Sequence, residues 1–165
     1  SFDVEERYIL SRVASTIMEV SERHEKYMID EITHKIESAY LELSRDYIQF
    51  IRDKEDKQLV VDTIFDSLLS IVKIMAPSLP FISEAIYQNL KSEYGLEEES
   101  IHMSSWPVAD EKRLDPSIEE EMRITKQVIT LILGKREEAG IGVRWLPATR
   151  GKASGFLENS SSIQG

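Results

Sequence analysis

The sequence contains no cysteine, which excludes disulfide scaffolds, thiol nucleophiles and metal sites with cysteine ligands. Only seven glycines and five prolines occur in 165 residues, so long helices with few connections are favoured over a many-turned sandwich or barrel. No run approaches the roughly 18 apolar residues of a membrane-spanning helix, and no signal-like segment opens the chain. Because 41% of the residues are apolar, the chain can bury a core. We therefore expect a soluble, cytoplasmic protein or fragment without a membrane partner.

The charge is unevenly distributed along the chain. Acidic residues outnumber basic ones by 30 to 20, giving a net charge of −10. Residues 93–121 carry ten acidic and two basic residues, whereas residues 122–165 carry three acidic and seven basic ones. This excess of acid excludes strong non-specific binding of polyanions, so DNA is not an expected partner. The net charge is compatible with a specific contact between a polyanion and a locally basic surface.

Apolar spacing predicts an all-α fold, an antiparallel bundle of about five helices with short connections between the first four. The predicted helices cover about 3–26, 29–51, 56–76, 80–90 and 116–139, with a loop at 92–115. A short strand-like alternation follows at 141–145. Asp3, Pro80 and Asp115 are expected at helix starts, where an aspartate accepts amide hydrogen bonds and a proline is tolerated.

The second predicted helix has the clearest period, with apolar residues at steps of three and four. These residues are Ile29, Ile32, Ile36, Tyr40, Leu43, Tyr47, Phe50 and Ile51. We expect Ile36, Tyr40 and Leu43 to be buried, and an exposed apolar end at Phe50 and Ile51 would fit a missing neighbouring domain. Trp106 in the loop is expected to plug the bundle with its ring buried and its indole nitrogen hydrogen-bonded.

No catalytic or metal-binding constellation is visible in the sequence. A glycine-rich phosphate loop is missing, and the three histidines lack the spacing of a metal site. The acidic runs 97–99 and 119–121 are typical of solvated loop and helix-start charges. We therefore predict no catalytic residue, no metal ligand and no cofactor in this chain.

Basic residues gather on the first two predicted helices, and one aromatic residue lies among them. The set is Arg7, Arg12, Arg45, Tyr47, Arg52 and Lys54. Cations that bind phosphates, beside a ring that stacks on a base, are typical of single-stranded RNA recognition. The alternative is that these cations form surface ion pairs with nearby carboxylates, which contribute little to stability. The nearby carboxylates are Glu5, Glu6, Glu42, Asp46 and Asp53. From the residue types and their spacing alone, surface ion pairing is favoured over RNA binding.

Six strings in order carry more information than any of them alone. They are EERYILSRV (5–13), LSRDYIQFIRDK (43–54), IMAPSLPFISEAIYQNL (74–90), ESIHMSSWP (99–107), EEEM (119–122) and KREEAGIGVRW (135–145). The series resembles the helical anticodon-binding domain of the class I aminoacyl-tRNA synthetases for isoleucine, valine and leucine. The strings at 99–107 and 135–145 are most similar to the isoleucine enzymes. The resemblance covers about residues 3–147.

The resemblance implies a helical anticodon-binding domain at residues 1–147 and an unstructured or extraneous tail at 148–165. It implies that the six residues of the basic set border the surface facing the anticodon arm of an isoleucine tRNA, away from the acidic stretch 93–121. The parent enzyme would be a monomer that joins isoleucine to tRNA with ATP. Its catalytic signatures HIGH and KMSKS do not occur here, so this chain would not be catalytic by itself.

Two departures from the family pattern and two alternatives accompany this interpretation. Asp46 stands where the family usually has tryptophan, and residues after Pro147 match nothing expected of the family. One alternative is the anticodon domain of a valine- or leucine-type synthetase. The other is a helical protein-interaction module unrelated to tRNA.

Overall fold

The computed structural model describes residues 2–140, and no strand occurs within that range. The helices are α1 (Val4–Glu25), α2 (Ile29–Leu41), a π-helical segment (Glu42–Tyr47), α3 (Ile48–Phe50), α4 (Lys57–Met75), α5 (Pro80–Tyr94) and α6 (Pro116–Glu138). The predicted all-α fold is confirmed. The strand-like alternation at 141–145 and the tail at 148–165 lie outside the described residues. No helix among residues 2–140 is long and apolar enough to cross a membrane.

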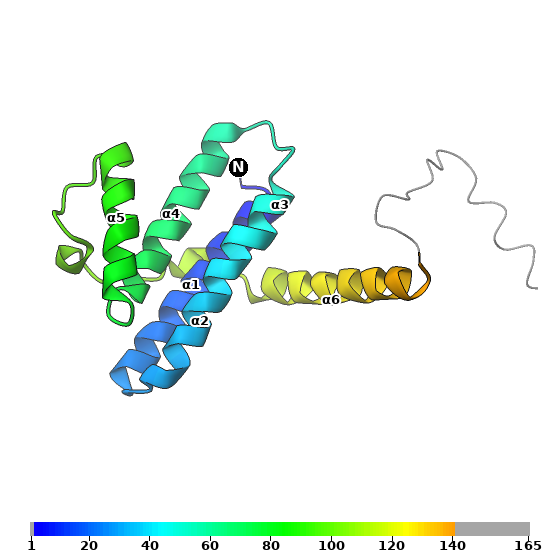
Figure 1. Ribbon diagram of the computed structural model, residues 1–165, viewed down its shortest axis with the longest axis horizontal. Helices are drawn as coiled ribbons and strands as arrows, with labels where there is room; N and C mark the ends of the chain where they lie inside the picture. The colour runs from blue at the N-terminus through cyan, green and yellow to red at the C-terminus, as the bar shows by residue number, and fades with distance from the viewer. Residues whose placement is uncertain (1, 141–165) are drawn as a thin grey trace, which may run out of the picture. The chain divides into compact units, whose positions relative to one another are not determined.

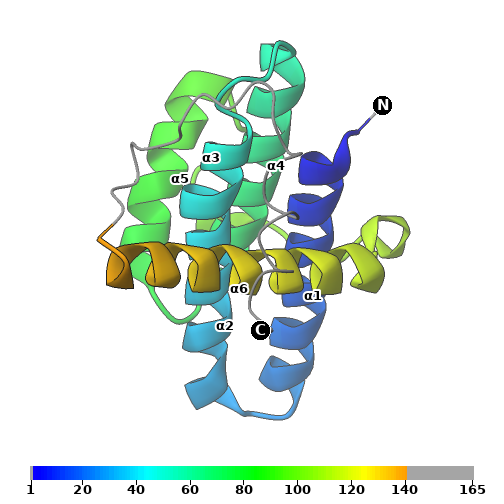
Figure 2. The same cartoon turned by 90° about the vertical axis from the view of Figure 1, so that its right-hand side faces the viewer.

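Four helices of the first part of the chain alternate in direction, as Figures 1 and 2 show. α2, the π-helical segment and α3 follow one another without a break and are here called the second helix. α1 packs against the second helix and against α4, and α4 also packs against α5. The chain divides into two compact units after Met122, so the first turns of α6 belong to the unit that contains α1–α5.

The helix ends follow the capping rules that the sequence predicted. At the start of α1, the Asp3 amide donates to Glu6 Oε2 at 3.2 Å, and Asp56 Oδ1 accepts from the Leu59 amide at 3.0 Å at the start of α4. Asp115 Oδ1 caps α6 by accepting from the Ile118 amide at 3.2 Å. α5 ends four residues later than expected, where Gly95 adopts the left-handed φ of 68° that glycine tolerates best.

The π-helical segment changes which side chains of the second helix are buried. Its wider turn shifts the helical phase, so the buried residues beyond α2 follow at steps of four. The buried set is Ile32, Ile36, Ala39, Leu43, Tyr47 and Ile51. Burial of Ile36 and Leu43 is confirmed, but the prediction for Tyr40 is wrong, because its side chain is 43% exposed. The exposed apolar end that a missing neighbouring domain would leave at Phe50 and Ile51 does not occur, because Ile51 is buried and Phe50 is half-buried.

The packing of α5 and of Trp106 departs from simple burial of large apolar side chains. On α5, Phe81 and Ile82 are exposed, and the helix buries Ser83 and Tyr87. Trp106 is 39% exposed and therefore does not plug the bundle. Its predicted hydrogen bond is confirmed, since the indole N–H donates to Ser21 Oγ at 2.8 Å.

Candidate nucleic-acid interface

The π-helical segment is attached to α1 at both of its ends by tyrosine–carboxylate hydrogen bonds. At its first residue, Glu42 Oε2 accepts from the Tyr8 hydroxyl of α1 at 2.5 Å. At its last residue, the Tyr47 hydroxyl donates to Glu6 Oε1 of α1 at 3.1 Å. In the first pair α1 supplies the tyrosine, and in the second pair α1 supplies the carboxylate. Together the two hydrogen bonds fix the register of the π-helical segment against α1.

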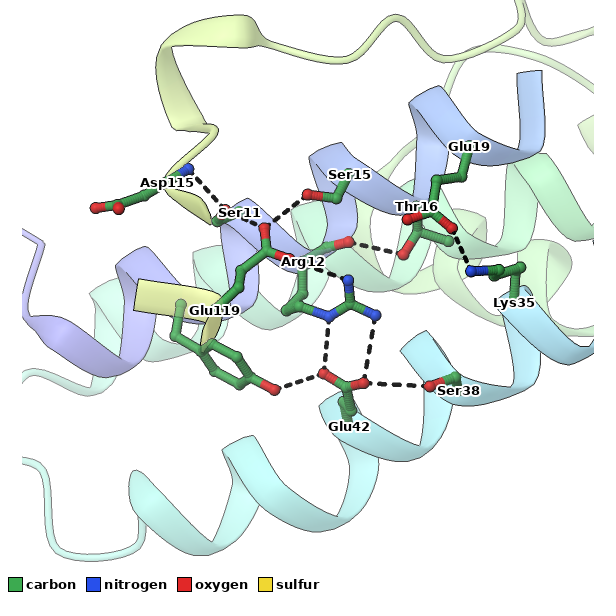
Figure 3. A network of polar contacts seen from close by, with 11 residues as sticks. Ser11, Arg12, Ser15, Thr16, Glu19, Lys35, Ser38, Glu42, Asp115 and Glu119 are labelled. Carbon is green, nitrogen blue, oxygen red and sulfur yellow. Dashed lines mark hydrogen bonds and ion pairs between the residues drawn. The ribbon is translucent and has the colours of Figure 1, made fainter. Parts of the chain in front are cut away.

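Arg12 lies between two carboxylates from distant parts of the chain, as Figure 3 shows. Its Nε and Nη2 donate to Glu42 at 3.0 and 3.4 Å, and its Nη1 donates to Glu119 at 3.1 Å. Glu119 also accepts from the hydroxyls of Ser11 and Ser15. The Arg12 side chain is only 21% exposed. The network therefore joins α1 to the second helix and to the first turn of α6.

This network corrects the expectation that the acidic stretch 93–121 lies away from the basic residues. Glu119, expected to be solvated, is bonded to Arg12, and Asp115 pairs with Arg7 at 2.5 Å. The Ile118 amide and the Arg7 guanidinium hold the pKa of Asp115 below its usual value. Arg7 itself remains exposed, so its ion pair contributes little to stability.

Lys54 is surrounded by three carboxylates at the start of α1. Its Nζ lies 3.1 Å from Asp3, 3.0 Å from Glu5 and 2.6 Å from Glu6. Oxygen atoms of these three residues also lie within 4.8 Å of one another, a spacing that could hold a metal ion. The ammonium group already supplies a positive charge there, so the cluster has a structural explanation without a metal.

The pKa values of Tyr8, Tyr47, Arg12 and Lys54 are all raised above their usual values. Burial, reinforced by the neighbouring carboxylate, raises the pKa of both Tyr8 and Tyr47 above the usual value of about 10. Burial by itself would lower the pKa of Arg12 and of Lys54, but the surrounding carboxylates raise both. The phenols stay neutral and the cations stay charged throughout the physiological pH range.

Arg45 and Arg52 have a different environment from that of Arg12 and Lys54. Both side chains are exposed, and neither forms an ion pair or a hydrogen bond with any residue in the range that the structure describes. Arg45 belongs to the π-helical segment and Arg52 to the turn that follows α3. Ser44, Ile48 and Gln49 are exposed on the same stretch. This stretch, residues 44–52, is the basic outer surface of the second helix.

Two tyrosines of the second helix differ from expectation in opposite directions. Tyr47, a candidate to stack on a base, is fully buried, so neither face of its ring is open in this conformation. This burial agrees with its place in the apolar period. Tyr40 was expected in the core and is instead half-exposed, and Ala39 is the buried residue of that turn.

Residues 6–149 match the family model described as the anticodon-binding domain of tRNA ligase, and the chain therefore belongs to that family. The chain is 36% identical over 157 residues to an isoleucine–tRNA ligase of Methanothrix thermoacetophila and 37% identical over 152 residues to that of Thermococcus kodakarensis. The corresponding ligase of Pyrococcus horikoshii is 34% identical over 154 residues. These alignments cover 87–88% of this chain but only 14–15% of the relatives. The expected resemblance to the isoleucine group is confirmed.

Proposed function

We propose that this chain is the anticodon-binding domain of an isoleucine–tRNA ligase and that it binds the anticodon arm of isoleucine tRNA through Arg45 and Arg52. The observation that carries the proposal is the state of these two guanidinium groups, which are exposed and lack carboxylate partners among the described residues. A phosphate can bind such a group without first displacing a protein anion. When such a cation binds a phosphate, counterions are released from the nucleic acid, and this release contributes directly to affinity.

The other members of the basic set have supporting roles in this proposal. Arg12 and Lys54 are already bonded to carboxylates, so contact with a phosphate would require them to give up those bonds. They and Tyr47 hold the second helix against α1 and thereby position Arg45. Arg7 is intermediate, because its exposed pair with Asp115 could exchange for a phosphate at small cost.

The full-length protein would use ATP to join isoleucine to this tRNA, and it would do so as a cytoplasmic monomer without DNA or membrane partners. All of that chemistry belongs to parts of the protein beyond this chain, which spans only 14–15% of the length of its relatives. The contribution of this domain is selection of the tRNA and its orientation.

The test is the salt dependence of tRNA binding by the full-length protein carrying Arg45→Ala or Arg52→Ala. Each phosphate contact contributes about 0.7–0.9 to the slope of log affinity against log salt, so each variant is expected to lower the slope by about one. Lys112→Ala is the matched control. Lys112 is an exposed cation in the acidic stretch, and its removal is expected to leave the slope unchanged.

Comparison of isoleucine tRNA with valine tRNA and an unrelated RNA tests the specificity. A full-length protein that binds all three equally would refute the isoleucine assignment. Unchanged slopes in both arginine variants would show that the basic outer surface does not contact the tRNA.

A further inference from the structure

Asp115 binds two groups at once, one with each of its carboxylate oxygens. Its Oδ2 accepts from Arg7 Nη2 of α1 at 2.5 Å, and its Oδ1 caps α6 by accepting from the Ile118 amide at 3.2 Å. An aspartate is favourable at a helix start by itself, so the cap does not depend on Arg7. The ion pair between Arg7 and Asp115 can therefore open while the start of α6 keeps its cap.

Other bonds hold the start of α6 on α1. Glu119 accepts from Arg12 Nη1 at 3.1 Å, and the Asp115 amide donates to Ser11 Oγ at 2.8 Å (Figure 3). The Arg12 and Glu119 side chains are 21% and 17% exposed, whereas the Arg7 side chain is 53% exposed. Exposed ion pairs contribute little to stability, so the pair between Arg7 and Asp115 is the part of this contact that another anion can most easily replace.

Arg7 lies at the level of Arg45 along two packed helices. The residues on either side of Arg7 in the sequence are Glu6 and Tyr8, which bond to the last and to the first residue of the π-helical segment. Arg45 belongs to that segment, and both guanidinium groups are exposed. An RNA strand held at Arg45 therefore has neighbouring phosphates at the level of Arg7.

We infer that Arg7 is a third phosphate-binding residue and that Asp115 is an internal competing anion, which is displaced only by a tRNA already held on the basic outer surface. This inference rests on the proposed function. The carboxylate is tethered beside Arg7 at an effective concentration in the millimolar range, so a phosphate of a dilute, unrelated RNA does not displace it. A phosphate of a tRNA that is already bound is tethered as well, and it competes with the carboxylate on similar terms. Asp115 thus selects against RNA that does not engage the basic outer surface.

The experiment measures the salt dependence of RNA binding by the full-length protein carrying Asp115→Asn. Asparagine keeps the helix cap and removes the charge that pairs with Arg7. Asp110→Asn is the matched control, because Asp110 also caps a short helix, by accepting from the Lys112 amide at 3.1 Å, and also pairs with an arginine, Arg113, at 3.3 Å. Both variants change the net charge equally, so a difference between them reports on the position of the carboxylate.

With an unrelated RNA, Asp115→Asn is expected to steepen the slope of log affinity against log salt by about 0.7–0.9, the contribution of one phosphate contact, because Arg7 is then free to bind. With isoleucine tRNA the slope is expected to match that of the wild type, since this tRNA already displaces Asp115. The variant should therefore bind unrelated RNA several-fold more tightly and discriminate less against it. Asp115→Ser, a second uncharged helix cap, is expected to behave in the same way, and Asp110→Asn is expected to show neither change.

Equal slopes for unrelated RNA in Asp115→Asn and Asp110→Asn would overturn the inference. A gain that persists when Arg7 is also changed to alanine would overturn it too, because the freed cation would then not be Arg7. The same holds for a slope that steepens as much with isoleucine tRNA as with unrelated RNA, since Asp115 would then not be displaced in the wild type. Arg45→Ala and Arg52→Ala test the proposed function separately, because the gain with unrelated RNA depends on Arg7 and Asp115 alone.

Discussion

The inner and outer sides of the second helix use the same residue types in opposite ways. Where the second helix faces α1, Arg12 of α1 and Lys54, which follows the turn after α3, meet carboxylates at 2.6–3.1 Å. On the outer side, Arg45 and Arg52 meet no carboxylate of the described residues. The inner cations hold helices together, whereas the outer cations are available to a partner. A basic residue therefore indicates a binding surface only when its neighbours leave it unpaired.

The largest effect expected from this comparison concerns Leu43 and Tyr40, which lie on the two sides of one turn. Leu43→Ala should lower the free energy of unfolding by about 2–5 kcal/mol, because it leaves a cavity in the core. Tyr40→Ala should cost less than about 1 kcal/mol, since the ring is half-exposed. Denaturant unfolding of both variants measures the difference. Equal losses would mean that Tyr40 is buried.

The same comparison can be sharpened with two adjacent carboxylates that share Lys54. Glu6 is fully buried and accepts hydrogen bonds from both Tyr47 and Lys54, so Glu6→Ala should cost about 3 kcal/mol. Glu5 is more exposed and should contribute less than about 1 kcal/mol when changed to alanine.

Glu6→Gln serves as the isosteric control, because it keeps an acceptor for Tyr47 while removing the charge that pairs with Lys54. Its loss of stability should lie between those of the two alanine variants. Denaturant unfolding at neutral pH measures all three. A loss for Glu5→Ala as large as that for Glu6→Ala would contradict the inner position of Glu6.

Much of this fold could be predicted, because helix periods and caps are local properties of the sequence. Asp3, Asp56, Pro80 and Asp115 mark helix starts through interactions with residues close by in the chain. The π-helical segment could not be predicted in this way. It depends on Tyr8 and Glu6 of α1, which hold Glu42 and Tyr47 from more than thirty positions away. Local patterns of the sequence do not contain these contacts.

The candidate site was predictable as a set of residues but not as an arrangement. All six residues of the basic set lie on α1 or at the end of the second helix, as expected. Which of them are already bonded is decided by long-range contacts, such as the bond from Arg12 to Glu119, 107 positions away. The sequence allows ion pairs of the basic set with Glu42, Glu5 and Glu6, and such pairs occur for Arg12 and Lys54. Pairing with Glu119 left no signal in the sequence.

The smallest expected effect at neutral pH concerns the two phenols of the inner side. Tyr8 and Tyr47 have raised pKa values, because they are buried and donate to carboxylates. A raised pKa in the folded state stabilises the fold below the usual phenol pKa of about 10, and this contribution is lost as the pH rises above it. Absorbance of the phenolate form should therefore show at least two of the six tyrosines ionising only as the protein unfolds in alkali. The double variant Tyr8→Phe, Tyr47→Phe should lose the tyrosine ionisation that accompanies unfolding. Ionisation of all six wild-type tyrosines in one step near pH 10 would contradict the two tyrosine–carboxylate hydrogen bonds.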